Sequence, residues 1–460
     1  MSLKPEYKEL KKKIYQALRD KALKPEDEFY VDVYNLPDCP DPVNKLRDHI
    51  ELTDIESVQF FSGFRGSGKT TELLRLQQDL EESGYFVVYA DALKYINPAD
   101  EIDITDLLIV LAGAFSDAIE ENANIKARLL HESYWTRIYN YLKNTDLELT
   151  EITPKAGVGK TGVASAEIAL KVALQTTPTF RRKVQDHLKN RIGALKEEVD
   201  LFFEDGVKAV KSALSDETQV VFIFDSLEQI RGSLFNDQAV IESVERVFSQ
   251  HFKMLKMPYL HVIYTVPPWL KFVMKNPPTR IEVLPCVKHW EKGESRITHN
   301  DGKNKFREII LKRFGAEEFK TFFGADWDSA QRTQADKLID FCGGHFRDLL
   351  SLLREAVLDA NDFPISDQEI EHAISSVRST FLPVSKEDAL LLSEIAKTNS
   401  SGLTDENNGR LAKLLDTHLV LYFKNGEEWY DIHPLIRDEV DKVVRQIELE
   451  KAKLESVKVK

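Results

Sequence analysis

Eight consecutive residues, Gly63-Phe-Arg-Gly-Ser-Gly-Lys-Thr70, have the types and the spacing that phosphate chemistry requires. They match the pattern G-x-x-x-x-G-K-[ST] in full. The glycines let such a loop wrap closely around phosphate groups, so that its backbone N–H groups point inward. An apolar stretch precedes the loop and an amphipathic stretch follows it, which is the strand–loop–helix context that the pattern needs. The sequence therefore predicts a loop that binds ATP or ADP.

Each polar residue of the loop has an expected role. Lys69 is expected to bridge β- and γ-phosphate oxygens and to serve catalysis, and the Thr70 hydroxyl is expected to ligate Mg²⁺. The other residues expected to contact the nucleotide are Gly63, Arg65, Gly66, Ser67, Gly68 and Thr71. A second Gly-Lys-Thr at 159–161 lacks the first glycine of the pattern, because Pro154 stands there. We interpret this second copy as a turn of a hairpin.

Two acidic residues are candidates for the partners of the loop. Asp225 ends the apolar run 219–224 and is expected to hold the Mg²⁺ shell, although a helix cap is the ordinary alternative. Glu228 is the candidate for polarising the attacking water, with a solvated surface acid as its alternative. Asp91 also follows an apolar strand, and a cap or turn acid explains it equally well.

A sheet must position these groups. Apolar runs predict strands at 58–62, 85–90, 219–224, 260–265 and 280–284, with helices at 69–82 and 104–122. Near-continuous apolar strands separated by helices are typical of a parallel sheet that is covered on both faces. The predicted fold class is therefore α/β, a P-loop NTPase followed by a helical lid and a C-terminal winged-helix domain.

The predicted domain boundaries follow from the same patterns. Residues 1–41 form an N-terminal helix, within 4–24, and a linker. Residues 42–290 form the core, 291–380 the lid, 381–440 the winged helix and 441–460 a helical tail. Lid helices are expected at 303–314, 331–341, 346–360 and 366–378, and the winged helix turns at Asn425-Gly426. An insertion at about 145–214 interrupts the core. Alternation from Ala166 to Leu174 predicts a hairpin there, and residues 179–214 predict a long helix broken near Gly193 or Gly206.

Composition excludes several classes of protein. The chain has 460 residues, 62 of them Lys or Arg and 76 Asp or Glu, for a net charge of −14. This charge argues against a protein that coats nucleic acid or anionic membranes non-specifically. Cys39, Cys286 and Cys342 lack the spacing of a zinc site or a disulfide framework. With no signal peptide or membrane span in the pattern, a cytoplasmic location is expected.

The loop and the segment Val220–Glu228 together resemble the STAND and origin-recognition branches of the AAA+ ATPases. In many AAA+ enzymes a Glu directly follows the Asp of the Walker-B motif. In this chain the corresponding Asp is Asp225, and Ser226 follows it. The spacing Asp-Ser-Leu-Glu is similar to that of NACHT-type members, and this implies that Glu228 is the catalytic carboxylate. The resemblance also implies a sensor at Tyr264-Thr265, although the Arg that many STAND proteins carry next is replaced by Val266-Pro267-Pro268.

Two further residues take expected roles from the resemblance. The segment Gly343–Leu350 is similar to the second sensor of origin-recognition ATPases, which implies that Arg347 reaches the γ-phosphate. A surface Arg paired with Asp348 or Glu355 is the alternative. His433 follows the second strand of the predicted winged helix. In STAND switches a His at this place contacts the β-phosphate of ADP, so the resemblance implies the same contact for His433. Its alternative is the cap of a helix that begins at Pro434. AAA+ proteins often complete their sites with an Arg from the next subunit. Arg280, Arg307 and Arg313 are the candidates for this role, and the sequence does not choose among them.

The resemblance implies a nucleotide-operated switch with slow or partner-stimulated hydrolysis, which binds a protein partner or assembles with itself. In bacteria such proteins resemble components of anti-phage defence with a separate effector. The alternatives are a DNA-handling ATPase of the origin-binding or transposition-regulator type and a scaffold that does not hydrolyse ATP. Residues 384–440 carry six basic and eleven acidic side chains, which disfavours DNA binding by the winged helix. The basic residues Arg181, Arg182, Lys183, Lys189 and Arg191 leave a DNA or partner contact open in the insertion.

Overall fold

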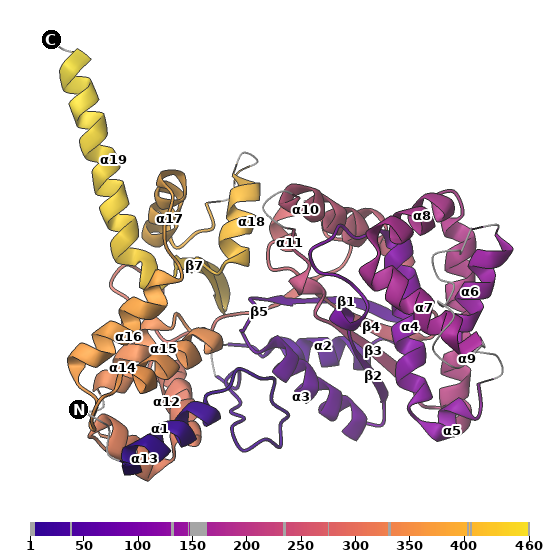
Figure 1. The fold of residues 1–460 in the computed structure, drawn as a ribbon, viewed down its shortest axis with the longest axis horizontal. Coiled ribbons are helices and arrows are strands. Elements are labelled where there is room, and N and C mark those ends of the chain that lie inside the picture. Colours follow the sequence, from indigo (N-terminus) through magenta and orange to yellow (C-terminus); the bar gives the residue numbers. More distant parts are fainter. Residues whose placement is uncertain are drawn as a thin grey trace. The chain divides into compact units, whose positions relative to one another are not determined.

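The computed structural model describes residues 5–36, 39–129, 133–145, 147, 163–232, 236–274, 276–329, 333–402, 404 and 407–458 (Figure 1). The chain divides into two compact units. Unit 1 comprises Met1–Pro42, Gly63–Leu74 and Leu284–Lys460, and unit 2 comprises Val43–Ser62 and Arg75–Val283. The phosphate-loop motif therefore belongs to unit 1, although the strand that leads into it belongs to unit 2.

Unit 2 is built on the predicted sheet. Its strands are β1 (Ser57–Gly63), β2 (Phe86–Asp91), β3 (Val220–Asp225), β4 (Leu260–Val266) and β5 (Ile281–Leu284), in the spatial order β2-β3-β4-β1-β5. The pairs β1·β4, β2·β3 and β3·β4 are parallel, and every residue of β1, β3 and β4 is buried. Continuous burial explains why these strands read as unbroken apolar runs. The predicted α/β class and all five strands are confirmed.

Aromatic side chains join the sheet to its helices. Phe115 of α4 (Ile104–Glu120) lies 4.9 Å from Phe203 of α9 (Ile192–Ala213) and 5.6 Å from Phe222 of β3, measured between ring centroids. At Gly206 of α9 a Cβ would stand 2.7 Å from the Phe115 ring. Glycine at this position therefore lets α9 lie directly against α4 (Figure 1).

The insertion is helical, so the predicted hairpin is wrong. Residues 163–176 form α7, followed by α8 (Pro178–Leu188) and α9. Leu170 and Leu174 are buried, whereas Ile168 and Val172 are 66% and 49% exposed. Residues four apart share a helix face, and over a short stretch this spacing also satisfies a two-residue alternation. The predicted turn at 157–162, with the second Gly-Lys-Thr, lies outside the described residues. The long helix breaks after Leu188, just before Gly193 as predicted, and continues through Gly206.

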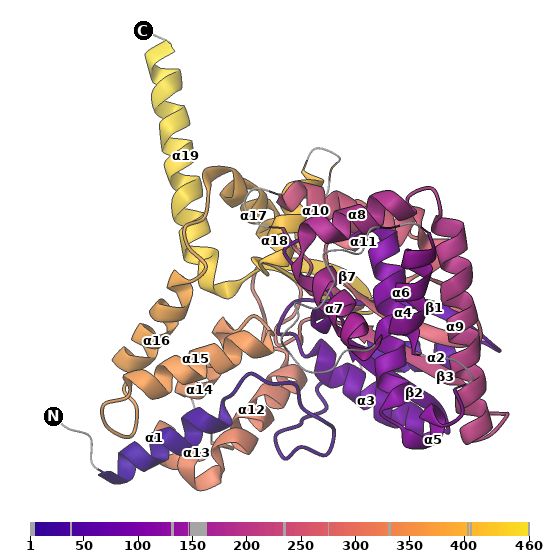
Figure 2. The same cartoon turned by 45° about the vertical axis from the view of Figure 1, so that its right-hand side comes forward.

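Unit 1 contains a bundle of helices. These are α12 (Asn300–Phe314), α13 (Ala316–Phe323), α14 (Thr333–Phe341), α15 (Phe346–Asp359) and α16 (Asp367–Ser379). The N-terminal helix α1 (Pro5–Ala17) lies along this bundle in both views (Figures 1 and 2). Lys11 Nζ of α1 donates to the carbonyls of Leu358 and Ala360, at the end of α15. The helix predicted within 4–24 is therefore shorter than expected and packs as part of the bundle.

The C-terminal elements follow the predicted order of helix, helix, hairpin and helix. They are α17 (Lys386–Thr398), α18 (Asn408–Asp416), β6 (Val420–Asn425), β7 (Glu427–Ile432) and α19 (Arg437–Lys458). The hairpin turns at Asn425-Gly426, where Gly426 has a φ of 83°.

Shorter elements complete both units. Cys39, Cys286 and Cys342 are buried thiols that are not joined in disulfides. None of the helices in the described ranges has both the length and the hydropathy that crossing a bilayer requires. The remaining helices are α2 (Pro42–Glu51), α3 (Lys69–Glu82), α5 (Ala123–Lys126), α6 (Tyr134–Asn144), α10 (Asp237–Glu245) and α11 (Leu270–Val273).

Candidate nucleotide-binding site

The loop of the phosphate motif turns through two glycines before α3 begins at Lys69. Gly66 and Gly68 have φ angles of 85° and 88°, a region that side chains disfavour. Ser67 closes the turn, because its Oγ and its backbone N–H both donate to the carbonyl of Phe64, at 2.8 and 3.2 Å. The predicted start of the helix at Lys69 is confirmed.

Lys69 is held at the loop. Its side chain is 4% exposed, and Nζ donates to the carbonyls of Gly63 at 2.9 Å and Phe64 at 2.8 Å. An anion in the loop would compete with these two carbonyls for the ammonium group. Thr71, also expected at the nucleotide, instead accepts a hydrogen bond through Oγ1 from the backbone N–H of Leu23. Thr71 thus fixes the N-terminal segment to α3.

The segment that leads into α15 lies against the same loop, within unit 1. The backbone N–H of Arg347 donates to the Gly66 carbonyl at 3.2 Å, and His345 Nε2 donates to the Arg65 carbonyl at 2.8 Å. A Cβ at Gly66 would stand 2.6 Å from Cβ of Arg347. The sequence motif Gly343–Leu350 is therefore a neighbour of the phosphate motif within unit 1.

The Arg347 side chain has a partner that the sequence does not indicate. Its Nε donates to Oδ2 of Asp20 at 2.6 Å, rather than pairing with Asp348 or Glu355. Both side chains are partly exposed, at 42% and 37%, so the pair contributes little to stability. Arg347 can exchange this carboxylate for another anion at small cost. Its contact with a γ-phosphate stays a prediction.

A cavity of about 90 Å³ adjoins the loop in unit 1. Four parts of the unit line it: the segment 20–33, the loop with the start of α3, α12 and α15. The segment 20–33 was not among the predicted site residues, and its alternating apolar residues from Phe29 to Val33 are the signal that could have indicated it. Apolar side chains that form the walls include Leu23, Phe29, Val31, Ile309, Phe346 and Leu349, and the charged groups are Asp20, Lys21, Glu72 and Arg313.

Asp225 and Glu228 belong to unit 2, and both are buried. Asp225 ends β3, where its Oδ2 accepts from the Tyr89 hydroxyl and its Oδ1 accepts from the backbone N–H of Ser226. Burial, together with the adjacent charge of Asp225, raises the pKa of Tyr89, so that the phenol remains a donor. Asp225 is therefore not a helix cap, and Glu228 is not a solvated surface acid.

The turn after β3 has a supporting residue on β4. Ser226 has a φ of 73°, and the one-turn helix Leu227–Gln229 follows it. Thr265 Oγ1 accepts from the backbone N–H of Leu227 at 3.0 Å, which holds the turn that carries Glu228. Tyr264, the other residue of the expected sensor, donates to the carbonyl of Leu255 and is fully buried. Asp91 accepts from the N–H of Leu93, so the alternative of a cap is the one found.

His433 is fully buried and both of its ring nitrogens have protein partners. Nδ1 accepts from the backbone N–H of Leu435, and Nε2 lies 3.2 Å from Oδ2 of Asp348. Burial lowers the pKa of His433. His433 thus caps the one-turn helix that begins at Pro434. Its contact with a β-phosphate stays a prediction, and this contact would require Nε2 to leave Asp348. Burial favours the protonated form of Asp348, but the adjacent imidazoles outweigh it and hold the pKa of this carboxyl well below its ordinary value.

The three arginines considered for action in trans differ in exposure. Arg313 is buried and donates to the carbonyl of Ala17, and Arg307 forms two bonds with Asp336. Arg280 pairs with Glu282 but keeps 67% of its side chain exposed. Of these three residues, Arg280 is the one that another molecule can reach.

Comparisons with known proteins give distant structural likenesses. No protein-family model matches the chain, and neither does any of the curated proteins. Among solved structures, the chain is similar to the ADP form of the ORC2 protein of Aeropyrum pernix, with 12% identity over 94% of this chain and 97% of that one and a TM-score of 0.40. A Walker-type ATPase of Pyrococcus abyssi has 14% identity over 91% and 100%, with a TM-score of 0.37. Cdc6p of Pyrobaculum aerophilum has 11% identity over 91% and 97%, with a TM-score of 0.29. Likenesses at this distance assign no activity, so function must be inferred from the chain's own residues.

Proposed function

We propose that the protein is an ATP-binding, Mg²⁺-dependent P-loop ATPase that acts as a nucleotide-operated conformational switch. The observation that carries the proposal is the complete phosphate motif, Gly63–Thr70, in its expected setting between β1 and α3. Positive φ angles at Gly66 and Gly68 and the buried ammonium of Lys69 are what close wrapping around phosphates requires. In this proposal Lys69 binds the β- and γ-phosphates.

The chemistry of the donors fits magnesium. Mg²⁺ prefers oxygen ligands from one or two side chains together with phosphates, and Thr70 and Asp225 supply a hydroxyl and a buried carboxylate. Asp225 is the last residue of β3, at the carboxyl end of a parallel strand, which is the edge at which such sheets bind ligands. The ion, when bound, neutralises charge on the phosphates. Glu228 would accept the proton of the attacking water. The turn that Thr265 supports holds Glu228 in place.

The cavity beside the loop is the proposed site of the nucleotide base. Its walls are mainly apolar, and it begins at Gly66 and Gly68, so a base in the cavity would have its phosphates directed to the loop. The segment 20–33 would then determine which base is bound, together with α12 and α15. Charged groups at the cavity, Glu72 and Arg313 among them, can select by hydrogen bonding.

The switch would act through Arg347. ATP and ADP differ by one phosphate, and a ligand shifts a conformational equilibrium only by binding its two states differently. Arg347 has its backbone on the loop and its side chain on Asp20, so a γ-phosphate would compete with Asp20 for the guanidinium. No observation carries an anti-phage role, and we do not propose one.

Nucleotide binding by Lys69→Ala tests the proposal directly. We expect titration with Mg²⁺-ATP to show binding by the wild type and none by Lys69→Ala, because the loop then lacks its phosphate cation. Lys160→Ala changes the second Gly-Lys-Thr and is the matched control, which should bind as the wild type does. Equal affinity in Lys69→Ala and the wild type would refute the proposal.

The state of the nucleotide distinguishes the switch from its alternatives. We expect the purified protein to contain ADP and to change its assembly, measured by light scattering, when ADP is exchanged for ATP. Hydrolysis that occurs only with duplex DNA would favour the DNA-handling ATPase. Bound ATP that stays intact over many hours would favour the scaffold.

A further inference from the structure

A cluster of four buried or nearly buried polar side chains lies in unit 1, at the junction of α15 and the C-terminal hairpin. Asp348 of α15 is its centre. Nδ1 of His345, Nε2 of His418 and Nε2 of His433 lie 2.8, 3.3 and 3.2 Å from its Oδ2. His345 and His433 are fully buried, and the side chain of His418 is 20% exposed. Nothing in the proposed nucleotide chemistry uses this convergence.

The hydrogen bonds of the cluster define the form of each imidazole. His345 Nε2 bonds to the carbonyl of Arg65 and must therefore carry a hydrogen, which leaves the lone pair of the neutral ring on Nδ1. Nδ1 faces Asp348 at 2.8 Å but makes no hydrogen bond there. His418 Nε2 is likewise a buried atom without a hydrogen-bond partner. Two imidazole nitrogens and a carboxylate oxygen thus face one another.

His433 has a different form. Its Nδ1 accepts from the N–H of Leu435, so the hydrogen of the neutral ring is on Nε2, which donates to Asp348. His433 is therefore a group that orients the carboxylate. A backbone carbonyl on the distal nitrogen of His345 and a donor on the carboxylate are the supports that surround protein metal ligands.

We propose that His345 Nδ1, Asp348 Oδ2 and His418 Nε2 bind a divalent transition-metal ion of the zinc type. The three ligand atoms lie within 4.8 Å of one another. In a tetrahedral site with bonds of about 2.0–2.1 Å, ligand atoms are roughly 3.3 Å apart, which is close to the separations found here. Two imidazoles and one carboxylate suit zinc better than Mg²⁺ or Ca²⁺, which prefer oxygen ligands alone.

The site would connect three parts of unit 1. His345 contacts the phosphate loop through the carbonyl of Arg65, Asp348 is on the first turn of α15, and His418 lies between α18 and β6. A bound ion would fasten the hairpin to the helix that touches the loop. The inference does not depend on nucleotide binding, because none of its three ligands takes part in the proposed ATP site.

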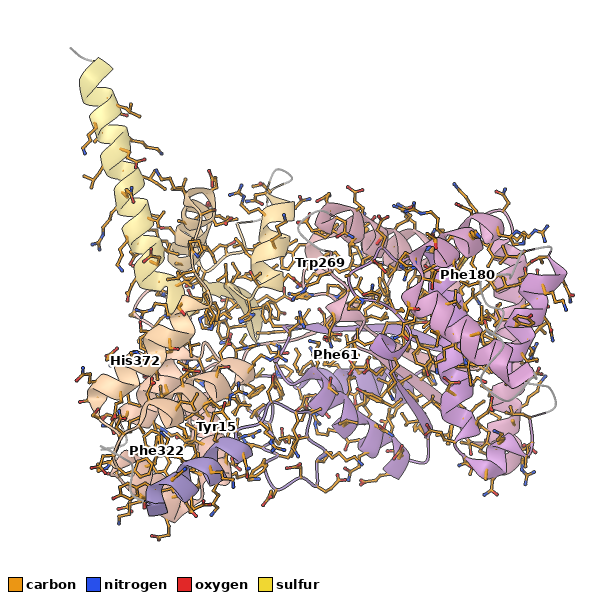
Figure 3. All side chains as sticks on the ribbon, in the orientation of Figure 1. Tyr15, Phe61, Phe180, Trp269, Phe322 and His372 are labelled. Carbon is orange, nitrogen blue, oxygen red and sulfur yellow. The ribbon has the colours of Figure 1, made fainter. Side chains whose placement is uncertain are left out.

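Metal analysis of the full-length chain, expressed without a histidine tag, tests the site. We expect about one zinc per chain by mass spectrometry after growth with added zinc. Asp348→Asn and His418→Gln should each lose it. His372→Gln should retain it, because His372 lies on α16 (Figure 3) with 72% of its side chain exposed and pairs with Asp359. Lys69→Ala should also retain zinc, which separates this inference from the proposed function.

Two measurements on the wild type decide the question even if the variants do not fold. Replacement by Co²⁺ should produce the visible absorption of a tetrahedral ion, and X-ray absorption should show imidazole nitrogen at about 2.0–2.1 Å from the metal. Chelation should lower the melting temperature, and Zn²⁺ should restore it. A wild type that takes up no zinc, or zinc that stays in both ligand variants, would overturn the proposal. The cluster would then be a protonated imidazole paired with Asp348.

Discussion

Glu228 is a buried carboxylate on a one-turn helix, held by a hydrogen bond from its neighbour Leu227 to Thr265. If it is the general base, Glu228→Gln removes proton acceptance and leaves the shape of the side chain nearly unchanged. We expect hydrolysis to slow by about 10²–10⁴-fold with nucleotide affinity preserved. Single-turnover hydrolysis and equilibrium binding measure the two effects separately. Glu217→Gln, at an exposed position, is the control. Hydrolysis at the wild-type rate by Glu228→Gln would remove Glu228 from the mechanism.

Asp106 gives unit 2 a pH dependence. Burial on α4 raises its pKa from 3.8 to about 7, although Gln185 donates to Oδ2, and Oδ1 has no hydrogen-bond partner among the described residues. Between these two values the folded protein binds a proton that the unfolded chain does not. The contribution to stability is therefore complete below about pH 4 and is lost as the pH rises through 7.

Asp106→Asn should remove this dependence, because an amide does not titrate. Between pH 5 and pH 8 we expect the wild type to lose more than about 1 kcal/mol of unfolding free energy relative to the variant. Denaturant unfolding at both pH values measures the difference, and Asp216→Asn, at an exposed position, should behave as the wild type does. Parallel pH profiles for wild type and Asp106→Asn would contradict the assignment.

At the scale of elements, the contact between the phosphate loop and the start of α15 depends on Gly66. Its φ of 85° disfavours any side chain, and a Cβ would meet the Arg347 side chain at 2.6 Å. Gly66→Ala should cost about 1–2 kcal/mol from the backbone alone and should also displace Arg347. We expect weaker ATP binding and a lower melting temperature.

Gly193→Ala is the matched control for Gly66→Ala. Gly193 lies in the first turn of α9, and a Cβ there would meet no atom within 4 Å beyond its chain neighbours and the backbone of its own helix. Alanine there should leave nucleotide binding unchanged and raise stability by a few tenths of a kcal/mol to about 1 kcal/mol. A Gly66→Ala protein with wild-type affinity and melting temperature would show that the loop can move away from α15.

The elements also show what the sequence can and cannot predict. The five strands and the start of α3 were predicted to within two residues, because buried apolar runs and a glycine loop are local signals. The helix α7 was predicted as strand, because Leu170 and Leu174 satisfy both periods. The partner of Arg347, Asp20, is 327 residues away in the sequence, and no local pattern encodes such a pair. The same holds for the convergence of His345, His418 and His433 on Asp348.

The path of the chain alternates between the two units. It passes between the two units after Pro42, Ser62, Leu74 and Val283, so that a segment of 12 residues with the phosphate motif belongs to unit 1. A ligand in the loop would therefore bind to a segment that is joined at both ends to unit 2. Nucleotide binding is thus expected to influence the stability of both units.

The net charge of the whole molecule predicts that the protein does not bind DNA non-specifically. The net charge of −14 repels the phosphates of DNA, and Arg181 of the basic insertion is buried against Asp100, although Arg182 and Lys183 beside it are exposed. Non-specific binders have dissociation constants of about 10⁻⁴–10⁻⁶ M, so the tighter ones raise the anisotropy of a labelled duplex at about 10 µM protein and physiological salt. We expect this protein to leave the anisotropy unchanged at that concentration. ATP hydrolysis should not respond to the duplex. Binding that weakens steeply with salt and disappears in Arg182→Glu would instead place a DNA contact on α8, where Arg182 is exposed.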